Sequence, residues 1–403
     1  MNTAALILRR FQAFTIVELL ASTAVFIGLM LLLVTATNQT GEMWRRSSTK
    51  VEQFQQARRG FEVMTRRISQ ATLNTYWDYL YPTDSKGAPD RTQVPLGYVR
   101  QSELRIRTGI ASKLVGEKDA ILRPTHGIFF QAPLGFVEDD VAEKVDPAKT
   151  HKPLNNLLNT WGYFLEVDDD SREIPEFLRG LIPTRTRSRL MELMEPSETF
   201  KMDNPRQKRD EKGNIITADP NWDNPKYLDW FIAPIQRRTP VRVVSENVLA
   251  LVILPRLTPQ DEAARLRATP PKKEVLCPLY DYDSKRLSNT AAGIANPKQK
   301  APDPELNPKN QLPPVVTVAM VAIDEGSAQR LSAVSPGDKS FGLDMKSLFL
   351  DSRKLEDDPG SAEAGDGDLS KLEQQLIEKK LTYRIFTSNV AIRGAKWSRW
   401  QEN

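Results

Sequence analysis

A single carboxylate lies near the start of the most apolar stretch of this sequence. Glu18 is followed by a run without charge, Leu19 to Val34, in which only Ser22 and Thr23 are neither apolar nor glycine. An ionisable group inside a membrane segment costs about 2–3 kcal/mol on insertion scales, so it is a functional hypothesis by default. The chemistry open to it is ion pairing, because a buried ion is expensive alone and tolerated when it is paired.

The apolar run is long enough to cross a membrane. The 24 residues from Phe14 to Thr37 would form a helix of roughly 36 Å at about 1.5 Å per residue, which spans a bilayer core. Arg9 and Arg10 precede the run and favour a cytoplasmic N-terminus, whereas Arg45 and Arg46 follow it. Charge bias alone therefore does not decide the orientation.

Three interpretations of this segment compete. The first is a secretory signal peptide cut after Ala36, although its apolar core exceeds the usual ~7–15 residues. The second is a plain signal anchor, in which Glu18 is an incidental residue at the membrane interface. The third gives Glu18 a function of its own, and the residues around Glu18 favour this interpretation.

The stretch "AFTIVELLAST" resembles the prepilin processing signal of type IV pilins and type II secretion pseudopilins. In that family a short basic leader ends in a small residue, an aromatic residue follows, and a glutamate stands four residues later. The matching residues here are the leader Met1–Ala13, Phe14 and Glu18. The sequence departs from the family pattern at Ala13, where glycine is usual.

The resemblance implies a processing step and an assembly role. Prepilin peptidase would cut between Ala13 and Phe14 and would N-methylate the new α-amino group of Phe14. In a filament the apolar helices bundle together, so the Glu18 carboxylate of one subunit would pair with the Phe14 ammonium of a neighbour and fix the register. Small residues that allow helices to approach closely follow at Ser22, Thr23, Ala24 and Gly28.

A helical pattern continues beyond the membrane segment. Apolar residues recur at spacings of three and four, which is typical of one face of a helix, and no proline interrupts the sequence from Phe14 to Tyr81. We expect one helix from about Thr15 to Leu73, with its first half in the membrane and its second half packed on a domain. The apolar stripe consists of Val51, Phe54, Ala57, Phe61, Met64, Ile68 and Ala71.

After Asn74 short strand-like runs alternate with connections rich in proline and charge. One long helix followed mainly by strands, without βαβ alternation, predicts an α+β fold with an antiparallel sheet. The resemblance implies that this fold is pilin-like, with the long helix packed on the sheet. The predicted strands are Leu104–Arg107, Gly127–Ala132, Tyr163–Val167, Val241–Leu254, Val315–Ile323 and Tyr383–Ile392, and the predicted helices are Arg187–Met194, Gln260–Arg267 and Leu369–Lys380.

The domain organisation follows from these segments. We expect a leader at 1–13, a transmembrane helix at 14–37, its amphipathic continuation at 38–74 and a head domain at 75–403. Loop-like insertions are expected near 138–153, 203–225, 269–314 and 351–367. The third contains "ANPKQKAPDPELNPKNQLPP", which cannot form a continuous helix or a central strand. We expect it to be a surface excursion, extended or disordered.

A second resemblance comes from stretches scattered through the head. "YLDWFIAP", "VVSENVLALVILPRL", "RSRLMELMEPSE" and "YRIFTSNVAIRGAKWS" look like landmarks of a prepilin-like family, Verru_Chthon cassette protein C. The layout is also similar to that of the J-type minor pseudopilin of type II secretion. These stretches are less specific than the N-terminal signal. They indicate related proteins but do not indicate a particular role.

The sequence holds no recognisable catalytic constellation. There is no HExxH, GxSxG, Walker A or dinucleotide-binding motif. Ser47 and Lys50 match SxxK on the predicted helix without companion motifs, and we interpret them as a polar helix face. His126 and His151 are too few for a His-rich metal site, and the single cysteine, Cys277, is expected to be a buried thiol. We therefore expect no enzyme activity, no metal and no cofactor.

Acidic clusters occur at Asp168–Asp170 and at Glu356–Asp358, the latter with Asp366 and Asp368 nearby. Some pseudopilins bind calcium in an acidic loop, and oxygen ligands suit that ion. Neither cluster has EF-hand spacing, so solvated loops are the favoured interpretation.

Basic residues alternate at Arg185, Arg187 and Arg189, and a second basic run follows at Arg206–Lys212 with acids interleaved. Binding of nucleic acid calls for a basic face with stacking aromatic residues, and that combination is missing here. The net charge of +4 over 403 residues is also small. We therefore expect no nucleic-acid partner.

These observations favour a non-enzymatic, prepilin-like subunit of a type IV pilus or a type II secretion-like apparatus, of the minor pseudopilin kind. It would cross the inner membrane once, with a cytoplasmic N-terminus and a periplasmic head. Its expected partners are prepilin peptidase, other prepilin-like subunits, an inner-membrane assembly platform and membrane lipid. The alternative is a single-pass, membrane-anchored periplasmic domain that binds a ligand and does not assemble. A third possibility, an anchored hydrolase, has no supporting motif.

Overall fold

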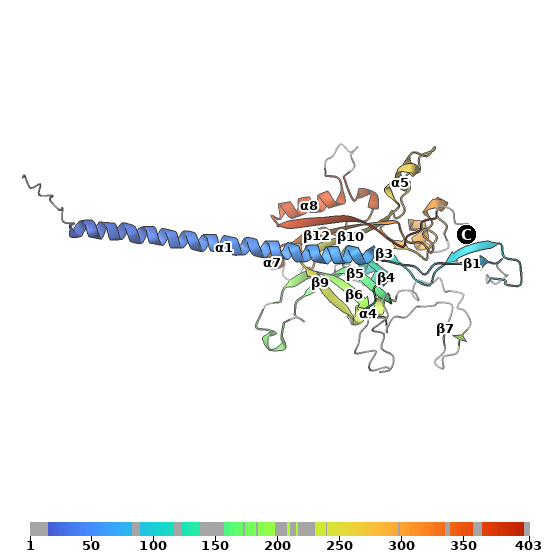
Figure 1. The fold of residues 1–403 in the computed structure, drawn as a ribbon, viewed down its shortest axis with the longest axis horizontal. Helices are drawn as coiled ribbons and strands as arrows, with labels where there is room; N and C mark the ends of the chain where they lie inside the picture. Colours follow the sequence, from blue (N-terminus) through green and yellow to red (C-terminus); the bar gives the residue numbers. More distant parts are fainter. Residues whose placement is uncertain are drawn as a thin grey trace, which may run out of the picture. The chain divides into compact units, whose positions relative to one another are not determined.

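The chain combines one long N-terminal helix with shorter helices and antiparallel strands (Figure 1). It divides into two compact units, Met1–Gln53 and Phe54–Asn403. The expected mixture of helix and antiparallel sheet is therefore confirmed. The computed structural model describes residues 15–82, 89–116, 122–136, 157–171, 174–182, 184–197, 208–209, 215–216, 230–238, 240–296, 299–334, 339–357 and 365–398.

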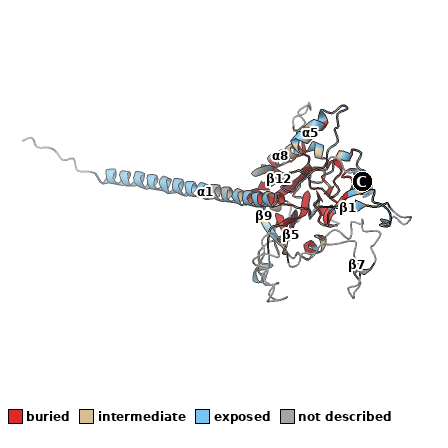
Figure 2. Ribbon diagram, turned by 45° about the vertical axis from the view of Figure 1, so that its right-hand side comes forward, coloured by how far each residue is buried: buried red, intermediate tan, exposed pale blue. Residues whose placement is uncertain are grey.

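Helix α1 (Ile16–Ile68) covers most of the predicted helical segment and ends before the predicted Leu73. In the first unit, the residues from Ile16 to Trp44 are all exposed (Figure 2). In the second unit, the helix buries one residue at every third or fourth position, as the apolar stripe predicts. These buried residues are Ala57, Phe61, Met64 and Ile68.

The larger sheet of the head has six strands in the order β11-β3-β4-β5-β6-β9, and every neighbouring pair is antiparallel. Successive side chains of a strand point to opposite faces, so Phe130 enters the main core while Phe129 faces the other side. There Phe129 stacks on Phe231 with ring centroids 3.8 Å apart. The strands are β3 (Arg107–Ile110), β4 (His126–Pro133), β5 (Leu158–Asp169), β6 (Thr186–Glu195), β9 (Val241–Glu246) and β11 (Tyr282–Asp283).

The smaller sheet has three antiparallel strands in the order β10-β12-β13. Strand β10 packs across β3, β4, β5 and β6, so the two sheets enclose the main hydrophobic core. The strands are β10 (Val248–Arg256), β12 (Val315–Ile323) and β13 (Tyr383–Ala391).

The second half of α1 completes this core by contacting both sheets. Phe61 lies against Phe386 of β13, with ring centroids 5.8 Å apart. On the other side, a Cβ atom at Gly60 would lie only 3.0 Å from the side chain of Val244 of β9, so the helix approaches this strand closely. The expected packing of the helix on an antiparallel sheet is therefore confirmed from Phe54 onward.

Shorter elements cover the sheets and connect the strands. The predicted helices Gln260–Arg267 and Leu369–Lys380 are confirmed as α5 (Pro259–Leu266) and α8 (Asp368–Glu378). The remaining elements are β1 (Tyr76–Leu80), β2 (Gly97–Gln101), α2 (Ala111–Val115), η1 (Glu176–Leu178), β7 (Lys208–Arg209), β8 (Ile215–Ile216), α4 (Ile232–Arg237), α6 (Ala291–Ala295), η3 (Pro304–Leu306), α7 (Glu325–Val334) and η4 (Ser352–Lys354).

The prediction of a helix at Arg187–Met194 is wrong, because this segment lies within β6. Both faces of β6 are buried: Leu190 points into the main core, while Met191 and Leu193 point into the second core under α4. A strand that is buried on both faces shows no alternation of polar and apolar residues. Tertiary packing therefore overrides the high helix propensity of its Leu, Met and Glu residues.

Two strand predictions are corrected in detail. The predicted strand Val241–Leu254 is two strands, β9 and β10, which belong to different sheets. Asn247 separates them with φ of 59°, a left-handed conformation that asparagine adopts more readily than most residues. The predicted strand Leu104–Arg107 begins three residues later, at Arg107. The predictions for β4, β5, β12 and β13 are confirmed apart from their ends.

The proline-dense segment 295–314 was predicted to be a surface excursion. Most described residues of its first half are exposed, so the prediction is wrong only for the second half. Its second half is irregular but buried, with Leu306, Asn310 and Leu312 each less than a tenth exposed. The side-chain amide of Asn310 donates through Nδ2 to the carbonyl of Arg100 at 2.7 Å, which fixes the segment beside β2. The proline residues exclude regular structure as predicted, but hydrogen bonds from side chains replace the missing backbone pairing.

The other expected insertions are described only in part. The insertion at 138–153 lies outside the described residues. Within 203–225 the structure describes only the short antiparallel pair of β7 and β8. Within 351–367 it describes 351–357, which includes η4, and 365–367.

Candidate functional site

The N-terminal part of α1 is the only described helix that is long and apolar enough to span a membrane. The segment Ile16–Trp44 has 29 residues, none of which is buried by other parts of the chain. A fully exposed apolar helix is unfavourable in water, because apolar surface transferred into an apolar environment gains about 25 cal/mol per Å². The segment is therefore long and apolar enough to cross a membrane.

Glu18 lies in the first turn of α1, at the third helical position. Its backbone N–H donates to Oγ1 of Thr15 at 3.3 Å, and the N–H of Leu19 donates to the carbonyl of Thr15 at 3.1 Å. Thr15 is thus the N-cap, and the sequence Thr-Ile-Val-Glu fits a capping box, a readable signal that the sequence analysis missed. A carboxylate here also interacts favourably with the helix dipole. The predicted cleavage site, Ala13 and Phe14, lies outside the described residues.

The small residues that follow Glu18 form their hydrogen bonds within the helix and make no packing contacts with the rest of the chain. The hydroxyl groups of Ser22 and Thr23 donate to the carbonyls of Leu19 and Leu20, each at 3.0 Å. A Cβ atom at Gly28 would meet nothing within 4 Å, so packing within the chain does not require glycine there. These residues leave a smooth surface on which a neighbouring helix can approach closely.

A polar cluster fixes the other end of α1 in the head. Arg67 donates to the carboxylate of Glu192, whose side chain is 1% exposed, and its guanidinium lies 4.0 Å from the ring centroid of Trp161. The same carboxylate accepts hydrogen bonds from Tyr163 at 2.6 Å and from Arg242 at 2.6 Å. Burial, with the adjacent Glu192, raises the pKa of Tyr163, so its hydroxyl remains a donor. Both oxygens of this buried carboxylate thus have donors, as a buried ion requires.

The acidic cluster at Asp168–Asp170 is neutralised by the protein itself. Arg238 donates to Asp168 at 3.0 Å, and Lys339 lies 3.4 Å from the same carboxylate. Asp170 accepts from the backbone N–H of Arg185 at 2.8 Å. Across the described residues, no group of three or more His, Cys, Asp or Glu side chains could hold a metal ion.

The second acidic cluster also has structural partners. Asp357 accepts from the backbone N–H of Gly367 at 2.8 Å, and Asp368 accepts from that of Phe349 at 2.7 Å. Burial raises the pKa of Asp368. Asp358 lies outside the described residues. These carboxylates therefore organise the loops before α8.

The alternating arginines at 185–189 do not form a basic surface. Arg187 pairs with Glu325 at 2.9 Å and with Glu246 at 3.2 Å, and Arg189 is buried. Within the second basic run the structure describes only β7. Arg187 and Arg189 therefore stabilise the packing of the head.

Cys277 and His126 are buried, and the structure gives both a structural role. Cys277 is 1% exposed, and burial raises the pKa of its thiol well above the usual value. Nδ1 of His126 accepts from the N–H of Ile253 at 3.2 Å, and Nε2 donates to the carbonyl of Phe349 at 3.1 Å. Burial lowers the pKa of His126 to about 4, so the ring is neutral at pH 7. His151 lies outside the described residues.

A buried ionic network that the sequence does not reveal joins the third insertion to the sheet. Asp283 accepts from Arg105 at 2.8 and 2.6 Å and from Arg107 at 2.8 Å. Burial opposes ionisation of Asp283, but the adjacent guanidinium groups of Arg105 and Arg107 outweigh it and lower the pKa of the carboxyl. The residues lie far apart in sequence, so no local pattern predicts their pairing.

Comparison of the chain with protein-family models, with curated proteins and with solved structures gives no match.

Proposed function

We propose that this chain is a non-enzymatic, prepilin-like subunit that is processed after Ala13 and assembles through its apolar helix. It acts in a type IV pilus or a type II secretion-like apparatus, with its head on the periplasmic side of the inner membrane. The observation that carries the proposal is the position of Glu18 in the first turn of a fully exposed apolar helix. That helix begins at Ile16, two residues after the proposed new N-terminus.

Electrostatics supports the pairing of Glu18 with a terminal amine. An α-amino group on Phe14 would stand next to the N-cap Thr15, where the partial positive charge of the helix terminus disfavours a cation. A carboxylate in the same turn, on this subunit or on a neighbour, offsets that repulsion. In an apolar bundle the pair neutralises two ions that would each be costly alone.

The architecture of the head supports a pilin-like fold. The second half of α1 packs between antiparallel sheets, which is the arrangement that the resemblance implies. The head is large and carries long insertions, and bulky heads pack poorly in a dense helical array. We therefore propose a minor, tip-like or priming subunit, a Verru_Chthon cassette protein C relative with a J-type layout.

Mass spectrometry of the mature chain tests the processing step. With prepilin peptidase co-expressed, we expect a chain that begins at N-methyl-Phe14. The matched control is a peptidase-free strain, which should yield the intact Met1 leader. A leader that stays intact beside active peptidase, or a start near Thr37, would overturn the proposal.

Two substitutions at Glu18 separate the assembly role from the capping role. Glu18→Gln keeps a capping-box residue but removes the charge, whereas Glu18→Val removes both. If the carboxylate pairs with a neighbour's amine, both variants should insert into the membrane yet lose at least tenfold in recovery of partner subunits by pull-down. Normal co-assembly of Glu18→Gln would show that Glu18 only caps the helix.

The alternative function, a membrane-anchored ligand-binding domain that does not assemble, is favoured by one observation. The head contains a cavity of the size that small molecules occupy. A ligand site and assembly are compatible, so this observation does not weaken the proposal.

A further inference from the structure

A cavity of about 680 Å³ lies in the head beneath the loop 339–350. Ligand sites in proteins typically have volumes of about 300–1,000 Å³ and mostly apolar walls with a few polar groups. Here one wall comes from the larger sheet and α2, another from β10, and the loop forms the cover. The apolar lining includes Val167, Leu249, Phe341, Met345 and Phe349.

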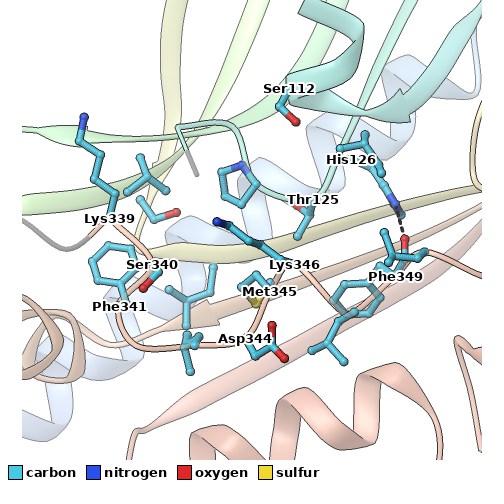
Figure 3. A pocket seen from close by; sticks show the side chains of 18 of the residues that line it. Ser112, Thr125, His126, Lys339, Ser340, Phe341, Asp344, Met345, Lys346 and Phe349 are labelled. Carbon is cyan, nitrogen blue, oxygen red and sulfur yellow. Dashed lines mark hydrogen bonds between the residues drawn. The ribbon is translucent and has the colours of Figure 1, made fainter. Parts of the chain in front are cut away.

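Ser112 and Lys346 are hydrogen-bond donors that face the cavity (Figure 3). Ser112 is 2% exposed, and its hydroxyl points into the cavity without a hydrogen-bond partner among the described residues. Lys346 extends from the loop across the cavity, and no carboxylate of the described part of the chain pairs with its ammonium group. The hydroxyl of Ser112 is therefore free to donate a hydrogen bond to an acceptor on a ligand in the cavity.

Two other charged groups of the lining have partners within the head. Lys339 lies 3.4 Å from Asp168, and the carboxylate of Asp344 accepts from the hydroxyl of Ser347 at 2.6 Å. Both ring nitrogens of His126 bond to backbone groups, so this neutral side chain cannot bind an anion. Lys113 of α2 also lines the cavity, without a carboxylate partner among the described residues. The unpaired charge offered to an occupant is therefore positive and comes from Lys346 and Lys113.

The loop that covers the cavity is held in a strained conformation. Phe341 and Phe349 have φ of 55° and 60°, the left-handed region that side chains rarely adopt. The backbone of Phe349 is held on both sides, because its N–H donates to Asp368 and its carbonyl accepts from His126. Strain of this kind is commonly retained where a loop clamps a ligand.

We propose that this cavity binds a small monocarboxylate with an apolar body, such as a medium-chain fatty acid. The carboxylate accepts from the ammonium of Lys346 and from the hydroxyl of Ser112, and the alkyl chain packs against Leu249, Met345 and Phe349. The site lies entirely in the head, so it does not depend on processing or assembly.

Equilibrium binding of radiolabelled dodecanoate to the full chain in lipid nanodiscs tests the proposal. Empty nanodiscs correct for partition into lipid, and dodecylamine of the same chain length is the matched ligand of opposite charge. We expect saturable binding of dodecanoate and at least tenfold weaker binding of dodecylamine. Absence of saturable binding above that of empty nanodiscs would overturn the proposal, as would equal affinity for the amine.

Three variants locate the site. Lys346→Glu should weaken dodecanoate at least tenfold, Ser112→Ala about threefold, and Met345→Trp should fill the cavity and abolish binding. Lys371→Glu changes an exposed lysine of α8 that does not line the cavity, so it should bind normally. Thermal melting confirms that each variant is folded; Lys346 is exposed, so its substitution leaves the core intact. Unchanged binding by folded Lys346→Glu would refute the site, whereas Glu18→Val should bind as wild type whether or not assembly fails.

Discussion

The two halves of α1 belong to one helix but differ in how apolar residues are distributed around it. From Ile16 to Trp44 every side chain is exposed, and apolar residues surround the helix. From Phe54 to Ile68 apolar residues form one stripe, and the stripe is buried in the core of the head. Hydrophobic residues on all sides indicate an apolar environment on all sides, whereas a stripe indicates one packed face.

The comparison also concerns how each half holds a carboxylate. In the head, Glu192 is buried and has three donors from Arg67, Tyr163 and Arg242. In the apolar half, Glu18 is exposed, and its backbone N–H donates to the side chain of the N-cap Thr15. The first carboxylate is completed by its own chain, and we propose that the second is completed by another subunit.

The largest expected difference between the halves is in the stability of the head. Met64→Ala removes a fully buried side chain, so it should lower the free energy of unfolding by about 3–4 kcal/mol. Leu31→Ala, the matched change in the exposed half, should alter it by less than about 0.5 kcal/mol. Denaturant titration of the full chain in detergent, followed by tryptophan fluorescence, measures both. Equal effects would show that the two halves are not distinct.

Acid should destabilise the head without affecting the apolar half. The pKa of His126 is lowered by burial to about 4, whereas in the unfolded chain it is about 6.5. Between pH 6.5 and pH 4, His126 therefore binds a proton in the unfolded state but not in the folded state. The free energy of unfolding should fall as pH drops from 6.5 towards 4, by at most about 3 kcal/mol from this group.

The two histidines provide the control for this pH dependence. Denaturant titrations at pH 7 and pH 5 should show a smaller difference in His126→Gln than in wild type. His151→Gln, the matched change at the other histidine, should keep the wild-type difference. A full pH response in His126→Gln would assign the effect to carboxylates elsewhere in the head.

A smaller effect should come from the polar cluster at the end of α1. Arg67→Ala leaves the buried Glu192 with only Arg242 and Tyr163, so it should cost about 2 kcal/mol in the free energy of unfolding. Arg66→Ala removes the neighbouring exposed arginine and should have little effect. Denaturant midpoints of the two variants make the comparison, and equal midpoints would remove the anchoring role from Arg67.

The sequence was sufficient to predict those elements whose local pattern agrees with their environment. The stripe of α1, the helices α5 and α8, and the strands β4, β12 and β13 all carry such a pattern. Strand β6 does not follow this rule. Leu190 and Met191 are buried on opposite faces of the strand, and both residue types favour helices. The division of β9 from β10 depends on one residue, Asn247, whose left-handed backbone a hydrophobic pattern does not encode.

The proline-dense segment shows the same limit for irregular structure. Composition correctly predicts that residues 295–314 form no long helix or strand, but it does not predict their burial. That burial depends on distant partners, such as the carbonyl of Arg100 for Asn310 and the backbone of Ser398 for Gln311. The cavity beneath loop 339–350 is likewise invisible in sequence, because Ser112 and Lys346 come from segments far apart in the chain.

The contact of α1 with β13 has a consequence for the timing of folding. Phe61 contacts Phe386, and the N–H of Arg393 donates to the carbonyl of Ser69 at 2.9 Å. A helix near the start of the sequence therefore packs against a strand near its end. Contacts this distant in sequence form slowly, since a long loop must close before they stabilise anything. A ribosome delivers the helix long before its partner strand. The head should therefore remain unfinished during synthesis, with the stripe of α1 open to chaperones until β13 has emerged.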